Sequence, residues 1–197
     1  VQLESHMRDV VRNFITVLGT DAVKATHREV IRRLREHNGT DPFTHIGEVL
    51  YGLPPDKARL GKKETHADWV AFSFDYGDED QLGIDSGRST PNQLLNHIVW
   101  FYSKVDPKCV LCNTYDHESE EFLGGSFRLV NKQSIRNFER FRHISETPCS
   151  DEEMSEFDDS DAINRISWTD YWNIQDELIA EAKEMMLAEH PDREFLF

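Results

Sequence analysis

Strand-like and helical patterns alternate along the first 115 residues, and their order constrains the fold of this chain more than any other feature. Runs rich in β-branched and aromatic residues predict strands over 12–18, 68–75, 81–85 and 108–115. Apolar residues recur at helical spacing over 21–36 and 91–104. Thr90 is predicted to cap the second helix, with Pro91 as its first residue. The order β-α-β-β-α-β predicts an α+β fold of the ferredoxin-like kind, with helices covering one face of an antiparallel sheet.

The remaining segments predict a loop in the middle of the chain and helices at its end. Glycine and proline punctuate residues 42–60, so we expect mostly loop there. After a predicted strand over 126–130, the basic and aromatic segment 133–143 has a helical pattern. Ser167 is the predicted cap of a last helix, whose apolar residues recur as far as Met186. We therefore expect a vector-derived tag at 1–6, a ferredoxin-like domain at 7–130 and an acidic helical extension at 131–197.

The net charge of −15 is concentrated in the last part of the chain. Residues 114–197 hold 21 acidic and 8 basic residues, a net charge of −13, whereas residues 1–113 hold 16 and 14, a net charge of −2. Such a field repels nucleic acid and anionic membranes, and it attracts basic protein surfaces. No apolar run approaches the roughly 18 residues of a membrane span, and no signal peptide is visible, so we expect a cytoplasmic protein.

Five short features occur in a fixed order along the chain. They are RNFITVLG at 12–19, FTHIGEVLYGLPP at 43–55, Trp69, IDSGRSTP at 84–91 and YDHESEEFLGG at 115–125. This order resembles that of the plasmid- and phage-encoded YubB-type proteins, which have a ferredoxin-like domain, and the resemblance covers about residues 8–130. One departure is that the Trp and double proline usually seen before the second helix are here Gly87, Arg88 and a single Pro91. The resemblance implies a bacterial or phage setting and carries over no catalytic residues.

Cys109, Cys112 and His117 are residue types that bind zinc. However, the two residues between the cysteines belong to a strand-like run, in which the two thiols point to opposite faces. The glycine-containing turn of a zinc knuckle and a convincing fourth ligand are both missing. We therefore predict core cysteines and no bound metal.

Two further clusters have both a functional and a structural interpretation. The acidic turn 116–121 lacks the central glycine and alternating oxygen ligands of a calcium loop, which favours a solvated turn. Together with His66, Asp68 and Trp69 it would form the pocket of a small ferredoxin-like enzyme or ligand-binding domain, our alternative prediction. The basic and aromatic residues 132–142 could stack on RNA, but internal pairing with acidic residues is favoured.

Residues 146–161 carry eight acidic residues and no Lys or Arg. A hydrated linker and a functional polyanion compete equally as interpretations. Duplex DNA carries about one negative charge per 1.7 Å of its axis, so a protein that imitates it must array carboxylates densely on a rigid frame. Met154 and Phe157 interrupt the run with apolar side chains, which favours docking onto a partner. The predicted partner-binding residues are Asp151, Glu152, Glu153, Glu156, Phe157, Asp158, Asp159 and Asp161, with Asp170, Asp176, Glu177 and Glu181 on the last helix.

These observations predict an acidic, non-enzymatic binding protein from a phage or plasmid. Its carboxylates would replace phosphates in the basic groove of a host nucleic-acid-binding defence protein, in the manner of an anti-restriction or anti-CRISPR protein. Trp168 and Trp172 would add apolar anchors if they are exposed. Besides the pocket alternative above, a third possibility is an accessory protein of a mobile element with a structural or regulatory role. We predict no cofactor and no direct contact with nucleic acid or membrane.

Overall fold

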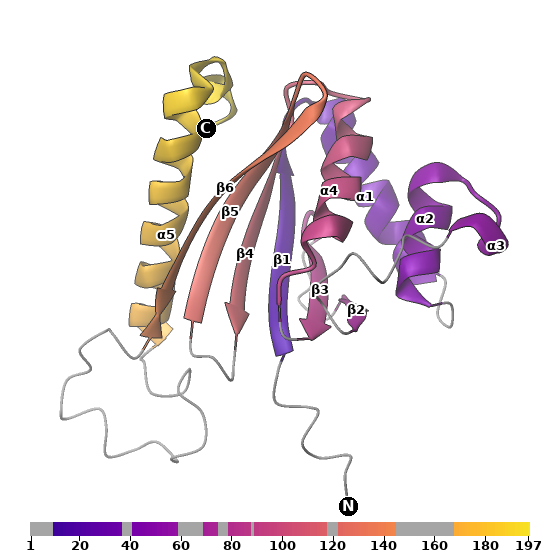
Figure 1. Ribbon diagram of the computed structural model, residues 1–197, viewed down its shortest axis with the longest axis horizontal. Helices are drawn as coiled ribbons and strands as arrows, with labels where there is room; N and C mark the ends of the chain where they lie inside the picture. Colours follow the sequence, from indigo (N-terminus) through magenta and orange to yellow (C-terminus); the bar gives the residue numbers. More distant parts are fainter. Residues whose placement is uncertain are drawn as a thin grey trace, which may run out of the picture.

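The structure, a computed structural model, describes residues 10–36, 41–58, 69–74, 79–87, 89–117, 122–144 and 168–197. It is a mixed α+β fold built on a six-stranded antiparallel sheet in the order β2-β3-β1-β4-β5-β6 (Figure 1). The strands are β1 (Val10–Leu18), β2 (Val70–Ser73), β3 (Leu82–Gly87), β4 (Val110–His117), β5 (Phe122–Asn131) and β6 (Ser134–His143). The helices are α1 (Asp21–Glu36), α2 (Pro42–Tyr51), α3 (Pro55–Ala58), α4 (Asn92–Ser103) and α5 (Trp168–Glu189), followed by the 3₁₀ helix η6 (Pro191–Leu196).

Strand β1 lies at the centre of the sheet and pairs with both β3 and β4. Its residues alternate between buried and half-buried, as expected of a strand with two unequal faces. Ile15 and Val17 point to the face where α1 and α4 pack, and they join the largest hydrophobic cluster of the protein. This face supplies the main core, in agreement with the predicted strand over 12–18 and the predicted helices over 21–36 and 91–104.

Helices cover both faces of the sheet. Helices α1 and α4 lie on one side of the strands and α5 on the other (Figure 1). The two sides have separate cores, because Leu111 of β4 packs toward α1 and α4, whereas Phe127 and Leu129 of β5 pack toward Ala182 and its neighbours on α5. Helix α5 therefore shares a core with the sheet.

The predicted loop over 42–60 is wrong for its first half, because residues 42–51 form helix α2. Asp41 caps the helix by accepting a hydrogen bond from the Thr44 amide at 3.3 Å, and Gly52 ends it with a positive φ of 63°. Gly47 lies within the helix at a position where no side chain fits. A Cβ atom added there would be only 1.8 Å from the backbone oxygen of Ala58. This glycine allows close packing of α2 against α3, whereas the sequence pattern had suggested that it interrupts the helix.

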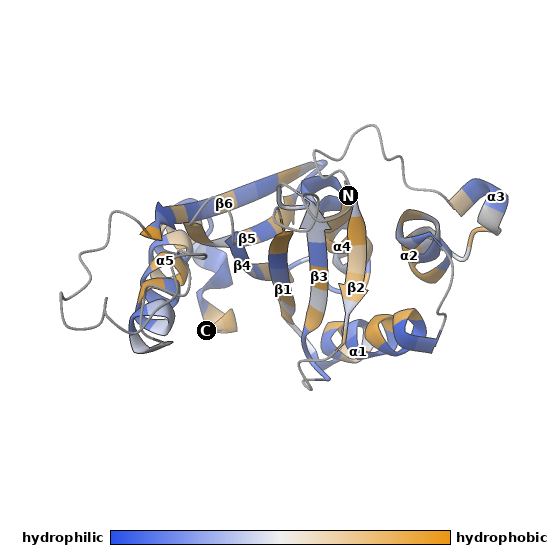
Figure 2. Cartoon of the chain, turned by 90° about the horizontal axis from the view of Figure 1, so that it is seen from below, coloured by the Kyte–Doolittle hydropathy of each residue, from blue (hydrophilic) through white to orange (hydrophobic). Residues whose placement is uncertain are grey.

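The predicted helix over 133–143 is also wrong, because this segment is the edge strand β6, paired along its length with β5. Charged residues make β6 largely hydrophilic (Figure 2), and its one fully buried side chain is Phe138. An edge strand with one buried residue has too few apolar positions to show the two-residue repeat of a strand. Its basic residues therefore resembled the polar face of a helix. Strand β6 thus continues the sheet past the expected boundary at residue 130.

Two smaller points concern the helix starts and the membrane. Helix α4 begins one residue later than predicted, after Pro91, and its first turn has no side-chain cap, so the expected cap from Thr90 does not form. The Ser167 cap lies outside the described residues. Among the helices that the structure describes, none is long and apolar enough to cross a bilayer.

Candidate functional site

The predicted partner-binding residues divide into two groups. Those from Asp151 to Asp161 lie outside the described residues, as does Phe157. The other four, Asp170, Asp176, Glu177 and Glu181, lie on α5 and are exposed. The structure therefore tests the arrangement of carboxylates only on this helix.

An ion-pair ladder joins α5 to the edge strand β6. The N···O distances are 2.5 Å for Arg136–Glu189, 2.8 Å for Arg142–Glu177 and 3.5 Å for Arg140–Glu181. All of these side chains are at least one-third exposed, so each pair stabilises the fold by about 1 kcal/mol or less. The basic segment thus pairs internally, as expected. Its partners lie on α5, and two of them, Glu177 and Glu181, are predicted partner-binding residues.

The ladder changes where the negative charge resides. Within residues 114–197, the described residues contain 10 of the 21 acids and 7 of the 8 bases, a net charge of −3. The other 11 acids and one base, a net charge of −10, fall in residues 118–121 and 145–167. The acidic field therefore comes mainly from these two connections, because the arginines of β6 offset part of the negative charge of helix α5.

Both connections are attached to the same end of the sheet. Residues 118–121 join His117 at the end of β4 to Phe122 at the start of β5. Residues 145–167 join Ile144, just after β6, to Trp168 at the start of α5. Strand register places these attachment points together, because Phe122 pairs with both His117 and His143. We call this end, defined by His117, Phe122, Ile144 and Trp168, the acidic end.

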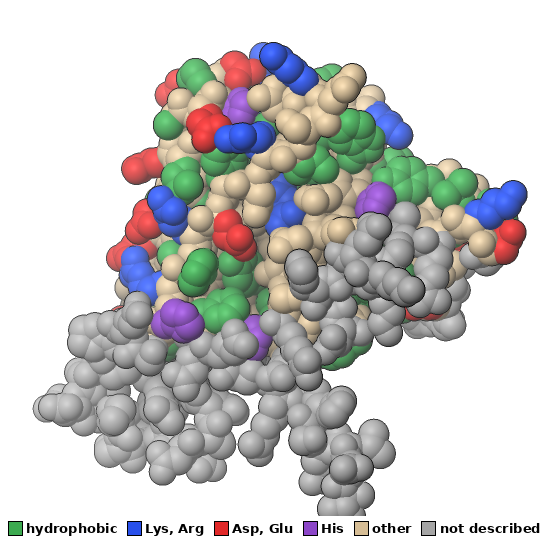
Figure 3. Space-filling model, viewed as in Figure 1, with side chains coloured by type: hydrophobic (Ala, Val, Ile, Leu, Met, Phe, Trp, Pro, Cys, Tyr) green, Lys and Arg blue, Asp and Glu red, His purple; other side chains and the backbone are tan. Residues whose placement is uncertain are grey.

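An aromatic cluster lies beside the acidic end on the face that α4 occupies. Phe122 contacts His117, Phe141 and His143, with ring centroids 4.8, 6.1 and 5.9 Å away. Phe141 is 60% exposed on edge strand β6. Figure 3 shows hydrophobic and histidine side chains gathered over the lower ends of β5 and β6. Contiguous exposed apolar patches mark contact surfaces more often than single exposed residues do, so the cluster is a candidate contact surface.

A second exposed aromatic residue belongs to the first turn of α5. Trp172 is 57% exposed and packs edge-to-face on Tyr171, with ring centroids 5.1 Å apart. Helix α5 lies on the opposite side of the sheet from Phe141 and starts at the same end of the sheet (Figure 1). The condition set for Trp172 as an apolar anchor, that it be exposed, is met. A partner that contacts both Phe141 and Trp172 would bind on both sides of the sheet at the end of the edge strand β6.

Asp116 fixes the start of α5 against the sheet. This carboxylate is 2% exposed, and its Oδ2 accepts a hydrogen bond from the Tyr171 hydroxyl at 2.9 Å. Its Oδ1 accepts a hydrogen bond from Arg12 Nε of β1 at 2.8 Å. One buried carboxylate thus joins β1, β4 and α5. Asp116 therefore has a structural role in the fold, whereas the sequence predicted it to lie in a solvated turn.

The alternative pocket is not assembled by its described members. Asp116 points to the α5 side of β4, while His117 is fully buried on the other side against Phe122. Trp69 packs on Gly87 at the end of β3, and β2 is three strands from β4, roughly 14 Å across the sheet. His66, Asp68 and residues 118–121 lie outside the described residues. The described parts of this pocket therefore lie on different surfaces.

The two described cysteines enter different cores. Cys109 belongs to the cluster beneath α1 and α4, and Cys112 packs toward the cluster beneath α5. This confirms that the thiols of Cys109 and Cys112 point to opposite faces. Burial raises the pKa of each thiol to about 12, so both remain protonated near neutral pH.

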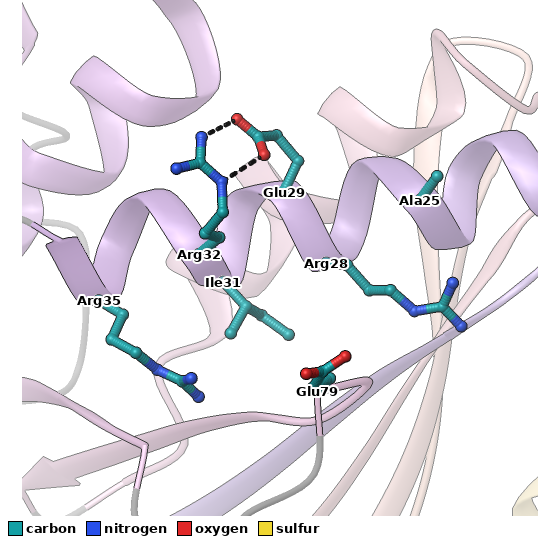
Figure 4. Close-up of a pocket in the computed structure, with 7 residues that line it drawn as sticks. All are labelled: Ala25, Arg28, Glu29, Ile31, Arg32, Arg35 and Glu79. Carbon is teal, nitrogen blue, oxygen red and sulfur yellow. Dashed lines mark hydrogen bonds and ion pairs between the residues drawn. The ribbon is translucent and has the colours of Figure 1, made fainter.

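A hollow of about 330 Å³ lies on α1, outside every predicted site. Figure 4 shows Arg28, Arg32 and Arg35 around it, with Glu79 facing them. Arg28 is paired with Asp80, and Arg32 with Glu29 and Glu36. Arg35 lies over the Phe74 ring, 5.4 Å from its centroid. Because these guanidinium groups already have partners, the hollow is a poor candidate for an anion site.

Comparison of the chain with protein-family models, curated proteins and solved structures found no match in any of the three.

Proposed function

We propose that this protein is a non-enzymatic binding protein that engages a basic partner through the acidic end of its sheet. The observation that carries the proposal is that two connections with a combined charge of −10 are attached to the end where Phe141 and Trp172 are exposed. Aromatic anchors surrounded by charged groups are the usual anatomy of a protein interface. Complementary charge would speed encounter, and the aromatic residues would supply contact area.

We further propose that the partner is a nucleic-acid-binding protein, whose basic groove the carboxylates occupy in place of phosphates. The support is the density of acids in residues 146–161, with eight in sixteen positions, and their attachment at both ends to the sheet and α5. The arrangement of α5 does not strengthen this part of the proposal, because Glu177 and Glu181 are balanced by arginines of β6. A host defence protein is the class of partner that the resemblance to mobile-element proteins favours.

A ferredoxin-like unit made of β1 to β4 with α1 and α4 is the architecture we infer for the first part of the chain. Its support is the order β1-α1-β2-β3-α4-β4 along the chain and the neighbour order β2-β3-β1-β4 in the sheet. Strands β5 and β6 extend that unit at the β4 edge, and they create the acidic end.

Neutralising Asp158, Asp159 and Asp161 to Asn is expected to weaken capture of the partner from a bacterial lysate by about tenfold, since each exposed charge contributes about 0.5 kcal/mol. The matched control neutralises Asp56, Glu184 and Glu194, which are exposed, form no ion pair among the described residues and carry the same total charge. Capture should also weaken steeply between low and high salt.

Excess duplex DNA should release the captured partner if carboxylates occupy a nucleic-acid groove. Capture that is insensitive to salt would contradict the binding proposal as a whole. Capture that is salt-sensitive but unaffected by DNA would contradict only the imitation of nucleic acid.

A further inference from the structure

Arg128 of β5 is among the largest fully buried side chains of the protein, with 1% of its surface exposed. It lies on the sheet face that α4 covers. Its guanidinium donates hydrogen bonds to Asn96 Oδ1 at 2.7 Å, to Asn92 O at 3.1 Å and to Asn92 Oδ1. All three acceptors are neutral amide oxygens, so the helix supplies hydrogen bonds but no negative charge. The positive end of the α4 dipole lies nearby and makes the position less favourable for a cation.

Within the described residues, no carboxylate is paired directly with this buried cation. Unlike the arginines of β6, Arg128 forms no ion pair with any residue that the structure describes. Glu139 of β6 shares its face of the sheet, but the Glu139 carboxylate accepts a hydrogen bond from the Tyr115 hydroxyl at 2.7 Å. Burial lowers the pKa of Arg128 to about 10, against the opposing effect of the Glu139 charge. A buried charge without an ionic partner is strongly unfavourable in a protein interior.

Three buried polar atoms on this face have no hydrogen-bond partner within the described ranges. They are Arg128 Nε, Ser126 Oγ and Asn113 Oδ1. Ser126 and Asn113 are paired across β5 and β4, and Arg128 follows Ser126 on the same face, roughly 7 Å along the strand. Buried polar atoms are nearly always paired. Water could complete these hydrogen bonds, but among the described residues it would leave Arg128 without an ion pair, with only the unpaired charge of Glu139 nearby.

We propose that Arg128 and Ser126 form a binding site for a small monoanionic carboxylate, held between β5 and α4. A guanidinium edge and a hydroxyl donor match the two oxygens of a carboxylate. Asn92, Asn96 and Glu139, which interact with Arg128, are half-buried. Figure 3 shows basic side-chain atoms between β6 and α4 on this face. A single negative charge is favoured over a phosphate dianion because Glu139 adds its own charge beside the site. This inference is independent of partner binding at the acidic end.

The test is a titration of the protein with sodium acetate at constant ionic strength, followed through the Nε–H resonance of Arg128 in ¹H–¹⁵N spectra. The resonance, identified by its loss in Arg128→Lys, should shift with acetate and saturate, and it should not respond to chloride alone. Glu139→Gln should tighten acetate binding roughly three- to tenfold, because it removes a neighbouring negative charge. Arg140→Lys, at an exposed arginine of β6, should leave the response unchanged.

The proposal is overturned if acetate gives no saturable shift in the wild-type protein, or if phosphate shifts the resonance and acetate does not. It is also overturned if Glu139→Gln weakens the response, since Glu139 would then be a structural partner of Arg128. Should Arg128→Lys fail to fold, the resonance is assigned by correlation of the Arg128 side chain with its backbone amide, and the wild-type and Glu139→Gln titrations decide the question.

Discussion

Replacing Leu178 by alanine is expected to destabilise the protein by about 2–5 kcal/mol. Leu178 of α5 is 1% exposed and packs with Leu123, Ile144, Tyr171 and Ile174 in the core between α5 and the sheet. Truncating it removes buried apolar surface and leaves a cavity, because the surrounding strands can collapse only partly. A loss of this size is a large fraction of the stability of an ordinary domain. Chemical denaturation, monitored by the fluorescence of the tryptophans, measures it.

The matched control is Leu53→Ala, the same chemical change at a leucine that is 37% exposed. Its expected effect is within about 0.5 kcal/mol, as for most surface substitutions. If Leu178→Ala were as mild as Leu53→Ala, α5 would be an appendage to the sheet, as the sequence had suggested. A large difference would establish α5 as part of one cooperative unit.

Asp116→Ala is expected to lower the free energy of unfolding by about 3 kcal/mol, the lower end of the range for breaking a buried ion pair. The lower end applies because Arg12 is 31% exposed and its guanidinium keeps contact with water. The substitution also removes the acceptor of the Tyr171 hydroxyl. Three elements, β1, β4 and α5, therefore lose a shared contact. Equilibrium unfolding in urea is the measurement.

Two controls separate the contributions at Asp116. Tyr171→Phe removes one hydrogen bond and should lower the stability by about 1 kcal/mol. Asp176→Ala, at an exposed carboxylate of the same helix, should have almost no effect. Equal effects of Asp116→Ala and Asp176→Ala would show that the buried carboxylate is not what fixes the first turn of α5.

Most of the sheet could be predicted because its strands have two unequal faces. Residues 12–18 alternate, and 70–73, 82–87 and 110–117 are short runs bounded by turns, so local pattern and position in the core agree. Strand β6 was missed because it lies at an edge, where a single buried residue, Phe138, hides its period. Helix α2 was missed because Gly47 was taken as a break, whereas it allows close contact with Ala58. Both errors concern residues whose roles depend on distant neighbours.

The candidate sites show the same division. The excess of acidic residues follows from composition, so the sequence could indicate it, whereas the sequence left the exposure of Trp172 open. The acidic end could not be predicted, because it depends on β6 bringing His143 beside Phe122 at the start of β5. Arg128 gave no signal, since an isolated arginine in a strand is usually exposed. Only the register of β4, β5 and β6 places it beneath α4.

The most direct test of partner binding at the acidic end is site-specific photo-crosslinking in a bacterial lysate. The photoreactive residue p-benzoylphenylalanine replaces Phe141, which is 60% exposed at that end, or Phe195 of η6, which is 66% exposed at the opposite end. We predict a crosslink to a basic protein from position 141 that is lost at high salt, and no such crosslink from position 195. A crosslink from position 195 with none from position 141 would contradict the account.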